Sequence, residues 1–130
     1  MTKFIYTLVP AFLLVFFTLT SFSGCKKPQS VCGVENPLTE LEWLSQIIAN
    51  WEENLQNGEN NWAGKIYQCT YEDNKIGFLI EPCSGCPDAG YSFWSCDGTM
   101  LCGGGGHSGE DTCGEFNIDS NSVKLIYTHN

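Results

Sequence analysis

Cysteine is the residue type that most constrains this chain, because eight of its 130 residues are cysteines. Such a density predicts a small domain that depends either on disulfides or on bound metal for its stability. Which of the two applies depends on the compartment, since thiols are oxidised outside the cytoplasm and stay reduced inside it. The N-terminal sequence bears directly on that choice.

An uncharged apolar run extends from Ile5 to Phe22, after Lys3, and ends in Phe22-Ser23-Gly24-Cys25. A positive residue, an apolar stretch and small residues before a cleavage point are typical of an export signal. The last four residues match a bacterial lipobox, so we expect cleavage before Cys25 and acyl chains, palmitate among them, on Cys25. An uncleaved membrane anchor is the alternative, and Pro10 together with the lipobox disfavours it. The expected location is the bacterial cell envelope, lipid-anchored on the periplasmic face or the cell surface.

Cleavage would leave 106 residues with a net charge of −10, enough for one domain with a modest core. Nothing in such a chain would neutralise phosphates, so we expect no nucleic-acid partner. We assign residues 1–24 to the signal peptide, 25–34 to a lipidated tether and 35–130 to a single domain.

The domain is predicted to be α+β, with one long N-terminal amphipathic helix on an antiparallel meander of about four to six strands. Asn36-Pro37 is typical of a helix start and Asn57-Gly58 of a helix end. An apolar stripe runs between them: Leu38, Leu41, Leu44, Ile48, Trp51 and Leu55.

Four strand segments and a final pair follow the helix. The first two, Lys65 to Tyr71 and Ile76 to Ile80, flank the turn signal Asp73-Asn74. The next two, Tyr91 to Cys96 and Thr99 to Cys102, flank Asp97-Gly98, which favours a two-residue hairpin turn. That turn would pair Cys96 with Thr99 and Phe93 with Cys102, leaving Cys96 and Cys102 on opposite faces. We expect the final pair to be Phe116 to Ile118 with Val123 to Thr128.

Seven cysteines remain after Cys25, which predicts three disulfides and one spare thiol. Spacing alone does not select a pairing, but we predict that Cys102 bonds Cys113 and staples the intervening glycine-rich loop. Within that loop the candidate partner contacts are His107, Glu110 and Asp111. The disulfide candidates are Cys69, Cys83, Cys86, Cys96, Cys102 and Cys113, with Cys32 placed in the tether.

Cys83-Ser84-Gly85-Cys86 also permits a redox dithiol, or a zinc site that recruits Cys96 and Cys102. Neither is favoured, because Pro87 and Asp88 follow instead of a helix and the spacing departs from paired zinc knuckles. Gly103 to Gly109 lacks the Lys-Ser or Lys-Thr of a phosphate loop, and Glu110 replaces the second glycine of a nucleophile elbow. We therefore expect no catalytic residue, no metal and no cofactor.

Several segments in order resemble a family of small uncharacterised lipoproteins from Bacteroidetes-type bacteria. They are Val34 to Leu38 leading into Leu41 to Leu44, then Asp97 to Cys102, then a glycine loop that reaches Cys113 before Phe116. The likeness covers most of Val34 to Tyr127. The family is a domain of unknown function, so the resemblance implies a fold and a location. This chain departs from it in its four consecutive glycines and in the separation of Cys83 from Cys86.

These observations favour a non-enzymatic envelope lipoprotein whose small disulfide-stabilised domain binds a protein or a glycan, or serves as an accessory subunit. The alternative is a small inhibitor of an exported hydrolase, since a preorganised loop loses little entropy on binding. A redox or zinc protein that uses Cys83 and Cys86 is the third hypothesis.

Overall fold

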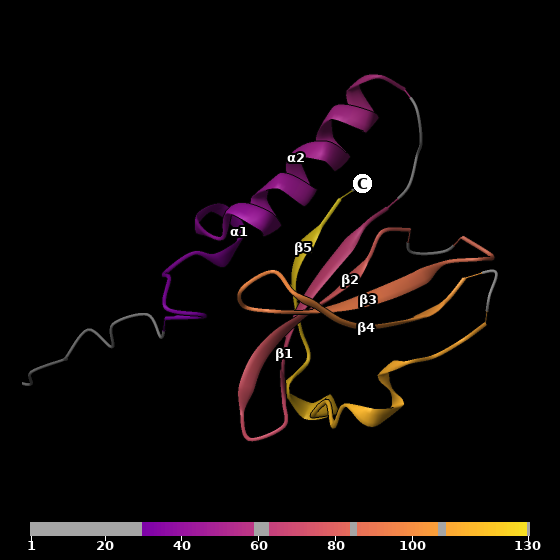
Figure 1. Ribbon diagram of the computed structural model, residues 1–130. Coiled ribbons are helices and arrows are strands. Elements are labelled where there is room, and N and C mark those ends of the chain that lie inside the picture. Colours follow the sequence, from indigo (N-terminus) through magenta and orange to yellow (C-terminus); the bar gives the residue numbers. More distant parts are fainter. Residues whose placement is uncertain (1–29, 59–62, 84–85, 107–108, 130) are drawn as a thin grey trace, which may run out of the picture.

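The computed structural model describes residues 30–58, 63–83, 86–106 and 109–129. These residues form an α+β domain in which helices lie against one face of a five-stranded antiparallel sheet (Figure 1). This confirms the predicted class and the predicted range of strand number. The lipobox, Cys25 and His107 lie outside the described residues.

The helical region is in two pieces, not one long helix. Helix α1 spans Pro37–Glu40 and α2 spans Glu42–Gln56, with Leu41 in an extended conformation between them. Asn36 caps α1 as expected, because its side chain accepts a hydrogen bond from the Leu38 N–H. The Leu41 carbonyl then accepts from the N–H groups of Leu44 and Ser45 and starts α2. The apolar stripe alone did not reveal this break, since both pieces keep their apolar side chains toward the sheet.

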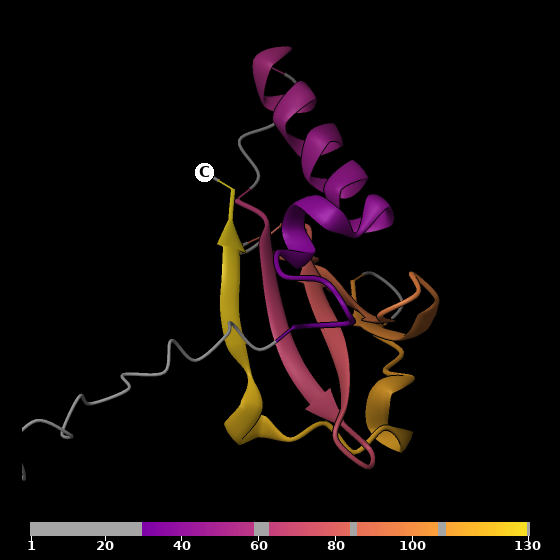
Figure 2. The same cartoon turned by 90° about the vertical axis from the view of Figure 1, so that its left-hand side faces the viewer.

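Five strands form the sheet in the order β4-β3-β2-β1-β5. Their bounds are β1 Lys65–Tyr71, β2 Lys75–Glu81, β3 Gly90–Ser95, β4 Met100–Gly105 and β5 Lys124–Thr128. Strands β1 to β4 form the expected meander, while β5 returns to pair with β1 at the opposite edge. Figure 2 views the sheet from the helix side, with β5 at one edge.

The expected final strand pair does not form. Ile118 makes only an isolated bridge to Tyr71, and β5 pairs with β1. Between them, the short 3-10 helix Ser120–Ser122 is tied to β1, because the Thr70 N–H donates to Ser122 Oγ and the Thr70 carbonyl accepts from the Asp119 N–H. These two bonds lead the chain along β1, so β5 adds to the sheet instead of folding back on residues 116–118.

The hairpin between β3 and β4 also differs from the prediction near its turn. Ser95 donates to the Thr99 carbonyl and accepts from the Gly98 N–H, so Cys96, Asp97 and Gly98 form a three-residue loop with Gly98 at φ +82°. A bulge between Phe93 and Trp94 in the ladder to β4 compensates, and Phe93 still pairs with Cys102 as predicted. Cys96 therefore has no partner at Thr99, and it does not bond Cys102.

Two apolar clusters cover the two faces of the sheet. On the helix face, Leu44 packs with Ile66, Phe78 and Ile80, and Trp43 stacks on Trp94 with ring centroids 5.6 Å apart. On the other face the buried residues are Cys69, Tyr71, Phe93, Cys102 and Cys113. The buried apolar residues of this small domain are thus divided between two small clusters. Since each cluster buries little apolar surface, we expect the disulfides to contribute much of the stability.

Candidate functional site

A shallow cavity of about 430 Å³ extends along β3 and β4, from Met100 at the start of β4 to Gly90 and Gly105 at the ends far from the hairpin turn. Its volume is within the range of small-ligand sites. Backbone of Gly90, Gly103 and Gly105 forms part of its wall, and the side chains of Ser92, Met100 and Glu110 contribute to the rim. We call this cavity the glycine groove.

The consecutive glycines are required by their positions in β4. A Cβ on Gly104 would lie 2.7 Å from Tyr91 Oη and 2.8 Å from Tyr91 Cζ, so the tyrosine ring occupies the space that a side chain would need. At Gly103 a Cβ would lie 3.0 Å from the Tyr91 carbonyl oxygen and 4.0 Å from Met100 Cε. The residues expected to form a loose loop, Gly103 to Gly105, are thus strand residues that leave room for Tyr91 and for the groove.

The segment that closes the groove is held on β4 from two sides. Cys102 and Cys113 are bonded, with Cα atoms 5.0 Å apart, as we predicted for this pair. Thr112 Oγ1 accepts from the Gly103 N–H at 3.0 Å and donates to the Gly103 carbonyl at 2.9 Å, while the Thr112 N–H donates to the same carbonyl. The edge of β4 is thereby covered at Gly103, and the neighbouring Glu110 is held against the groove.

The two described loop candidates have different roles. Glu110 is exposed and lines the groove. Asp111 accepts a 2.8 Å hydrogen bond from the Cys113 N–H, and it also interacts with Tyr91. Partial burial, and then the hydrogen bond to Asp111, raise the pKa of the Tyr91 hydroxyl. Asp111 therefore orients the stapled segment, and Glu110 is the carboxylate available to a ligand.

The described cysteines form three disulfides, Cys32–Cys96, Cys83–Cys86 and Cys102–Cys113. Cys69, one of our disulfide candidates, is instead a free buried thiol, because its side chain points into the cluster around Phe93. Cys32, which we placed in the tether, takes its place as a disulfide partner. The suggested zinc ligands are divided among all three bonds, which overturns that zinc hypothesis.

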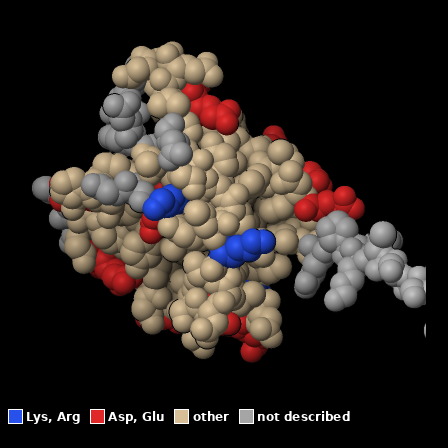
Figure 3. Space-filling view, turned by 180° about the vertical axis from the view of Figure 1, so that it is seen from behind, with Lys and Arg blue, Asp and Glu red and all other residues tan. Residues whose placement is uncertain are grey.

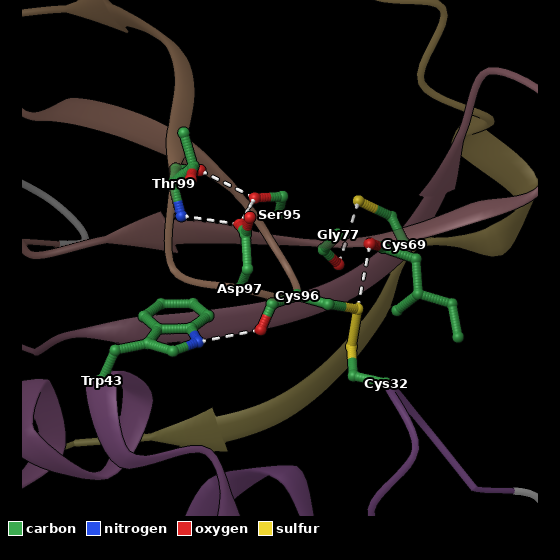
Figure 4. Close-up of a disulfide and its surroundings, with 9 residues drawn as sticks. Cys32, Trp43, Cys69, Gly77, Ser95, Cys96, Asp97 and Thr99 are labelled. Atoms are coloured by element: carbon green, nitrogen blue, oxygen red, sulfur yellow. Dashed lines mark hydrogen bonds between the residues drawn. A yellow bond between two sulfur atoms is a disulfide. The ribbon is translucent and has the colours of Figure 1, made fainter.

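Cys32 attaches the start of the described chain to the loop between β3 and β4 (Figure 4). Trp43 supports the same loop, because its Nε1–H donates to the Cys96 carbonyl at 3.1 Å. A glycine is required at position 98, next to the Trp43 ring, since a Cβ on Gly98 would lie 2.7 Å from Trp43 Cγ. Residues 31–34, which contain the bridge between Val31 and Val34, are thus held against the domain.

Residues 52–129 match the family model described as a domain of unknown function, DUF6970. The chain belongs to this family. The match includes all five strands of the DUF6970 domain, its glycine groove and two of its disulfides. It is narrower than the resemblance predicted from Val34, because Cys32, α1 and the first part of α2 precede it. No curated protein and no solved structure matches the chain.

The described residues of the DUF6970 protein include no helix with the length and apolar character that a membrane span requires. Nor do they contain a group of three or more histidine, cysteine, aspartate or glutamate side chains placed to hold a metal ion.

Sequence reasoning found Glu110 and the staple of the DUF6970 domain but missed the rest of the groove. Ser92 and Met100 come from two different strands, and only the strand pairing brings them together. The available signal was the run of glycines after Cys102. Read as strand instead of loop, it predicts a stretch of sheet without side chains.

Proposed function

We propose that this DUF6970 protein is a lipid-anchored binding domain of the cell envelope, and that its ligand or partner contacts the glycine groove. The proposal rests on one observation: the segment that closes the groove is attached to β4 twice. The Cys102–Cys113 disulfide makes one attachment, and the hydrogen bonds between Thr112 and Gly103 make the other. A surface held in this way is preorganised, so binding would cost little ordering entropy.

The groove offers hydroxyl, carboxylate and thioether groups. Ser92 Oγ accepts from Trp94 Nε1 at 2.7 Å, which leaves its own hydrogen available to a ligand. Glu110 supplies a carboxylate, and Met100, which is 56% exposed, supplies an adaptable apolar contact. A segment of a protein, or a glycan with its hydroxyl groups, matches this combination.

Charge supports a partner that is neither anionic nor a nucleic acid. No lysine or arginine is among the described residues that line the groove. On the side of the molecule seen in Figure 3, the basic side chains lie apart from each other among uncharged surface, and acidic side chains lie mainly toward the margin. A phosphate backbone requires a continuous basic surface, which this side does not offer.

The anchor rests on the lipobox that ends at Cys25, and a Bacteroidetes-type source rests on the resemblance described above. The three disulfides support an oxidising compartment. We expect the intact mass of the membrane-extracted protein to show a chain that begins at acylated Cys25. A mass that begins at Met1, or membrane binding that persists in a Cys25→Ala chain made without residues 1–24, would contradict the anchor.

Binding is tested by a charge change in the groove and an equal change elsewhere. Met100→Lys with Glu110→Lys alters two exposed groove residues, and Leu55→Lys with Glu53→Lys makes the same change on exposed residues of α2. After cross-linking in envelope extract, we expect the control variant to recover the same partner as the wild type and the groove variant to lose it. Equal recovery by both variants would show that the groove is not the binding surface.

The same experiment separates an accessory binding domain from an inhibitor of an exported hydrolase. The rigid stapled segment also suits an inhibitor, because such proteins present a preorganised loop. Recovery of a hydrolase whose activity falls on addition of the wild type, but not of the groove variant, would favour the inhibitor.

A further inference from the structure

The charges of the domain are divided between its two halves. The described lysines stand at the starts of β1, β2 and β5, as Lys65, Lys75 and Lys124. Between Lys75 and Lys124 the sequence has no lysine or arginine and seven acidic residues: Glu81, Asp88, Asp97, Glu110, Asp111, Glu115 and Asp119. This stretch contains β3, β4 and the segment that closes the glycine groove, so the groove lies in the acidic half of the domain.

Glu110 is the one charged residue among the described residues that line the groove. Its side chain is exposed, and it forms no ion pair with any described residue. Glu110 precedes Thr112 by two positions, and the hydrogen bonds of Thr112 to Gly103 hold this part of the chain beside β4. The groove therefore presents a carboxylate at a fixed place, and that carboxylate lacks a cationic partner within the described part of the chain.

Met100 supplies apolar surface next to this carboxylate. Its side chain is exposed and extends along the groove, because its Cε lies 4.0 Å from the place of a Cβ on Gly103. Gly103 is also the residue to which Thr112 is bonded. Lysine and arginine lay their aliphatic stems on apolar surface and keep the charged end at a polar rim. Met100 and Glu110 provide these two surfaces side by side.

The shape of the groove favours an extended peptide segment over a single small cation. The groove follows β4 from Met100 to Gly105, and a strand of six residues spans about 17 Å. At Gly103 both the N–H and the carbonyl are bonded to Thr112, so a segment would lie over the face of the sheet there and would not add a strand to β4. The Ser92 hydroxyl can donate to a carbonyl of that segment.

The same geometry disfavours a glycan. Tyr91 is the one aromatic residue among the described lining residues, and its ring fills the space of a Cβ on Gly104. Because successive strand residues point to opposite faces, the Tyr91 ring and the Ser92 hydroxyl lie on opposite sides of the sheet. The Thr112 hydroxyl already donates and accepts at Gly103. A ligand with many hydroxyl groups would thus find no aromatic face and few free donors among these residues.

We propose that the occupant of the glycine groove is an extended segment of a partner protein that carries a lysine or an arginine. The stem of this side chain lies on Met100, and its charged end lies at Glu110. This inference rests on the proposed function, which assigns binding to the groove, and adds the chemistry of the partner.

The experiment uses three libraries of acetylated pentapeptides on the immobilised full-length protein in detergent. The central residue is lysine, norleucine or glutamate, and the four flanking positions are randomised among uncharged residues. Norleucine keeps the stem of lysine without its charge. At low ionic strength we expect the lysine library to be retained about fivefold more than the other two, since a partly exposed charge pair contributes up to about 1 kcal/mol.

Two variants with the same loss of charge locate the contact. Glu110→Gln changes the groove, and Glu115→Gln changes an exposed carboxylate of the same acidic half that is not among the lining residues. The advantage of the lysine library should disappear with Glu110→Gln and persist with Glu115→Gln. Coupling of the retained peptides by a carbodiimide should join the lysine amine to the carboxylate of Glu110, and mass spectrometry locates the new amide.

Equal retention of the lysine and norleucine libraries by the wild type, a preference for the glutamate library, or retention of none of the three would overturn this inference. Equal loss in the two glutamine variants would do the same, because it would indicate a general charge effect. Failure of the proposed function has a different signature. In that case the groove variant and the α2 control would recover the same partner from envelope extract.

Discussion

Gly77 of β2 and Phe93 of β3 share one space on the face of the sheet away from the helices. A Cβ on Gly77 would lie 2.5 Å from Phe93 Cζ, and the Phe93 ring is fully buried against Tyr71, with ring centroids 5.0 Å apart. The absence of a side chain at Gly77 therefore allows the fully buried Phe93 ring to occupy this part of the sheet face.

We predict that Gly77→Ala destabilises the domain by about 1–3 kcal/mol, because the added methyl group overpacks a filled core. The matched control is Gly114→Ala, since a Cβ at Gly114 meets nothing within 4 Å. Urea denaturation of both variants measures the difference. Equal free energies of unfolding would show that the Phe93 ring moves aside at little cost.

Removal of the three disulfides should destabilise the domain in order of loop length. The sequence separations are 64 for Cys32–Cys96, 11 for Cys102–Cys113 and 3 for Cys83–Cys86. Loop-closure entropy then predicts losses of about 4, 3 and 2 kcal/mol for the three pairwise Cys→Ser variants. Chemical denaturation gives the three free energies, and a largest loss for the Cys83–Cys86 variant would contradict the order.

The Cys69 thiol should be unreactive in the folded protein. Burial raises its pKa to about 11, and its Sγ lies 3.8 Å from the Gly77 carbonyl oxygen. At pH 8 we expect no labelling of Cys69 by a thiol reagent in buffer and full labelling of Cys69 in denaturant. Labelling of the native protein at the rate of an exposed thiol would show that the site opens readily.

The same thiol should contribute to the dependence of stability on pH. The folded protein binds this proton more tightly than the unfolded chain, whose thiol titrates near its ordinary value of 9.0. Stability from this site is therefore full below pH 9 and declines as the pH rises through about 11. Wild type should lose more stability than Cys69→Ala over that interval, and parallel curves for the two proteins would refute this assignment.

The Asp97 carboxylate should support the β3–β4 hairpin only while it is ionised. Hydrogen bonds from the Ser95 hydroxyl and the Thr99 N–H lower its pKa. Its contribution is present above the unfolded pKa and is lost as the pH falls through the folded value. At pH 7, Asp97→Asn should have a lower thermal midpoint than the wild type. In strong acid, where Asp97 of the wild type is protonated, the two midpoints should differ less. Asp73→Asn, in the other hairpin turn, is the control and should leave the midpoint nearly unchanged.

Local patterns were sufficient where neighbouring residues decide the conformation. The cap at Asn36, the end of α2 near Gly58 and the first two strands follow from residues close in sequence. Local patterns were insufficient where contacts with residues far away in the chain decide the conformation. Leu41 breaks the helix without any glycine or proline at that position, and β5 joins β1 because Ser122 and Asp119 bond Thr70 across some fifty residues of chain.

The sequence by itself determined that this is a small acidic α+β domain dependent on disulfides, with a signal that points to export, because composition, periodicity and turn residues act locally. Only the tertiary structure decided which cysteine stays free and which residues form the groove. Cys69 faces the cluster around Phe93 while Cys32 reaches Cys96. Strand pairing brings Ser92 beside Gly103, and the Cys102–Cys113 bond with Thr112 brings Glu110 to the same groove. Such choices depend on distances between residues far apart in the chain, which no local pattern contains.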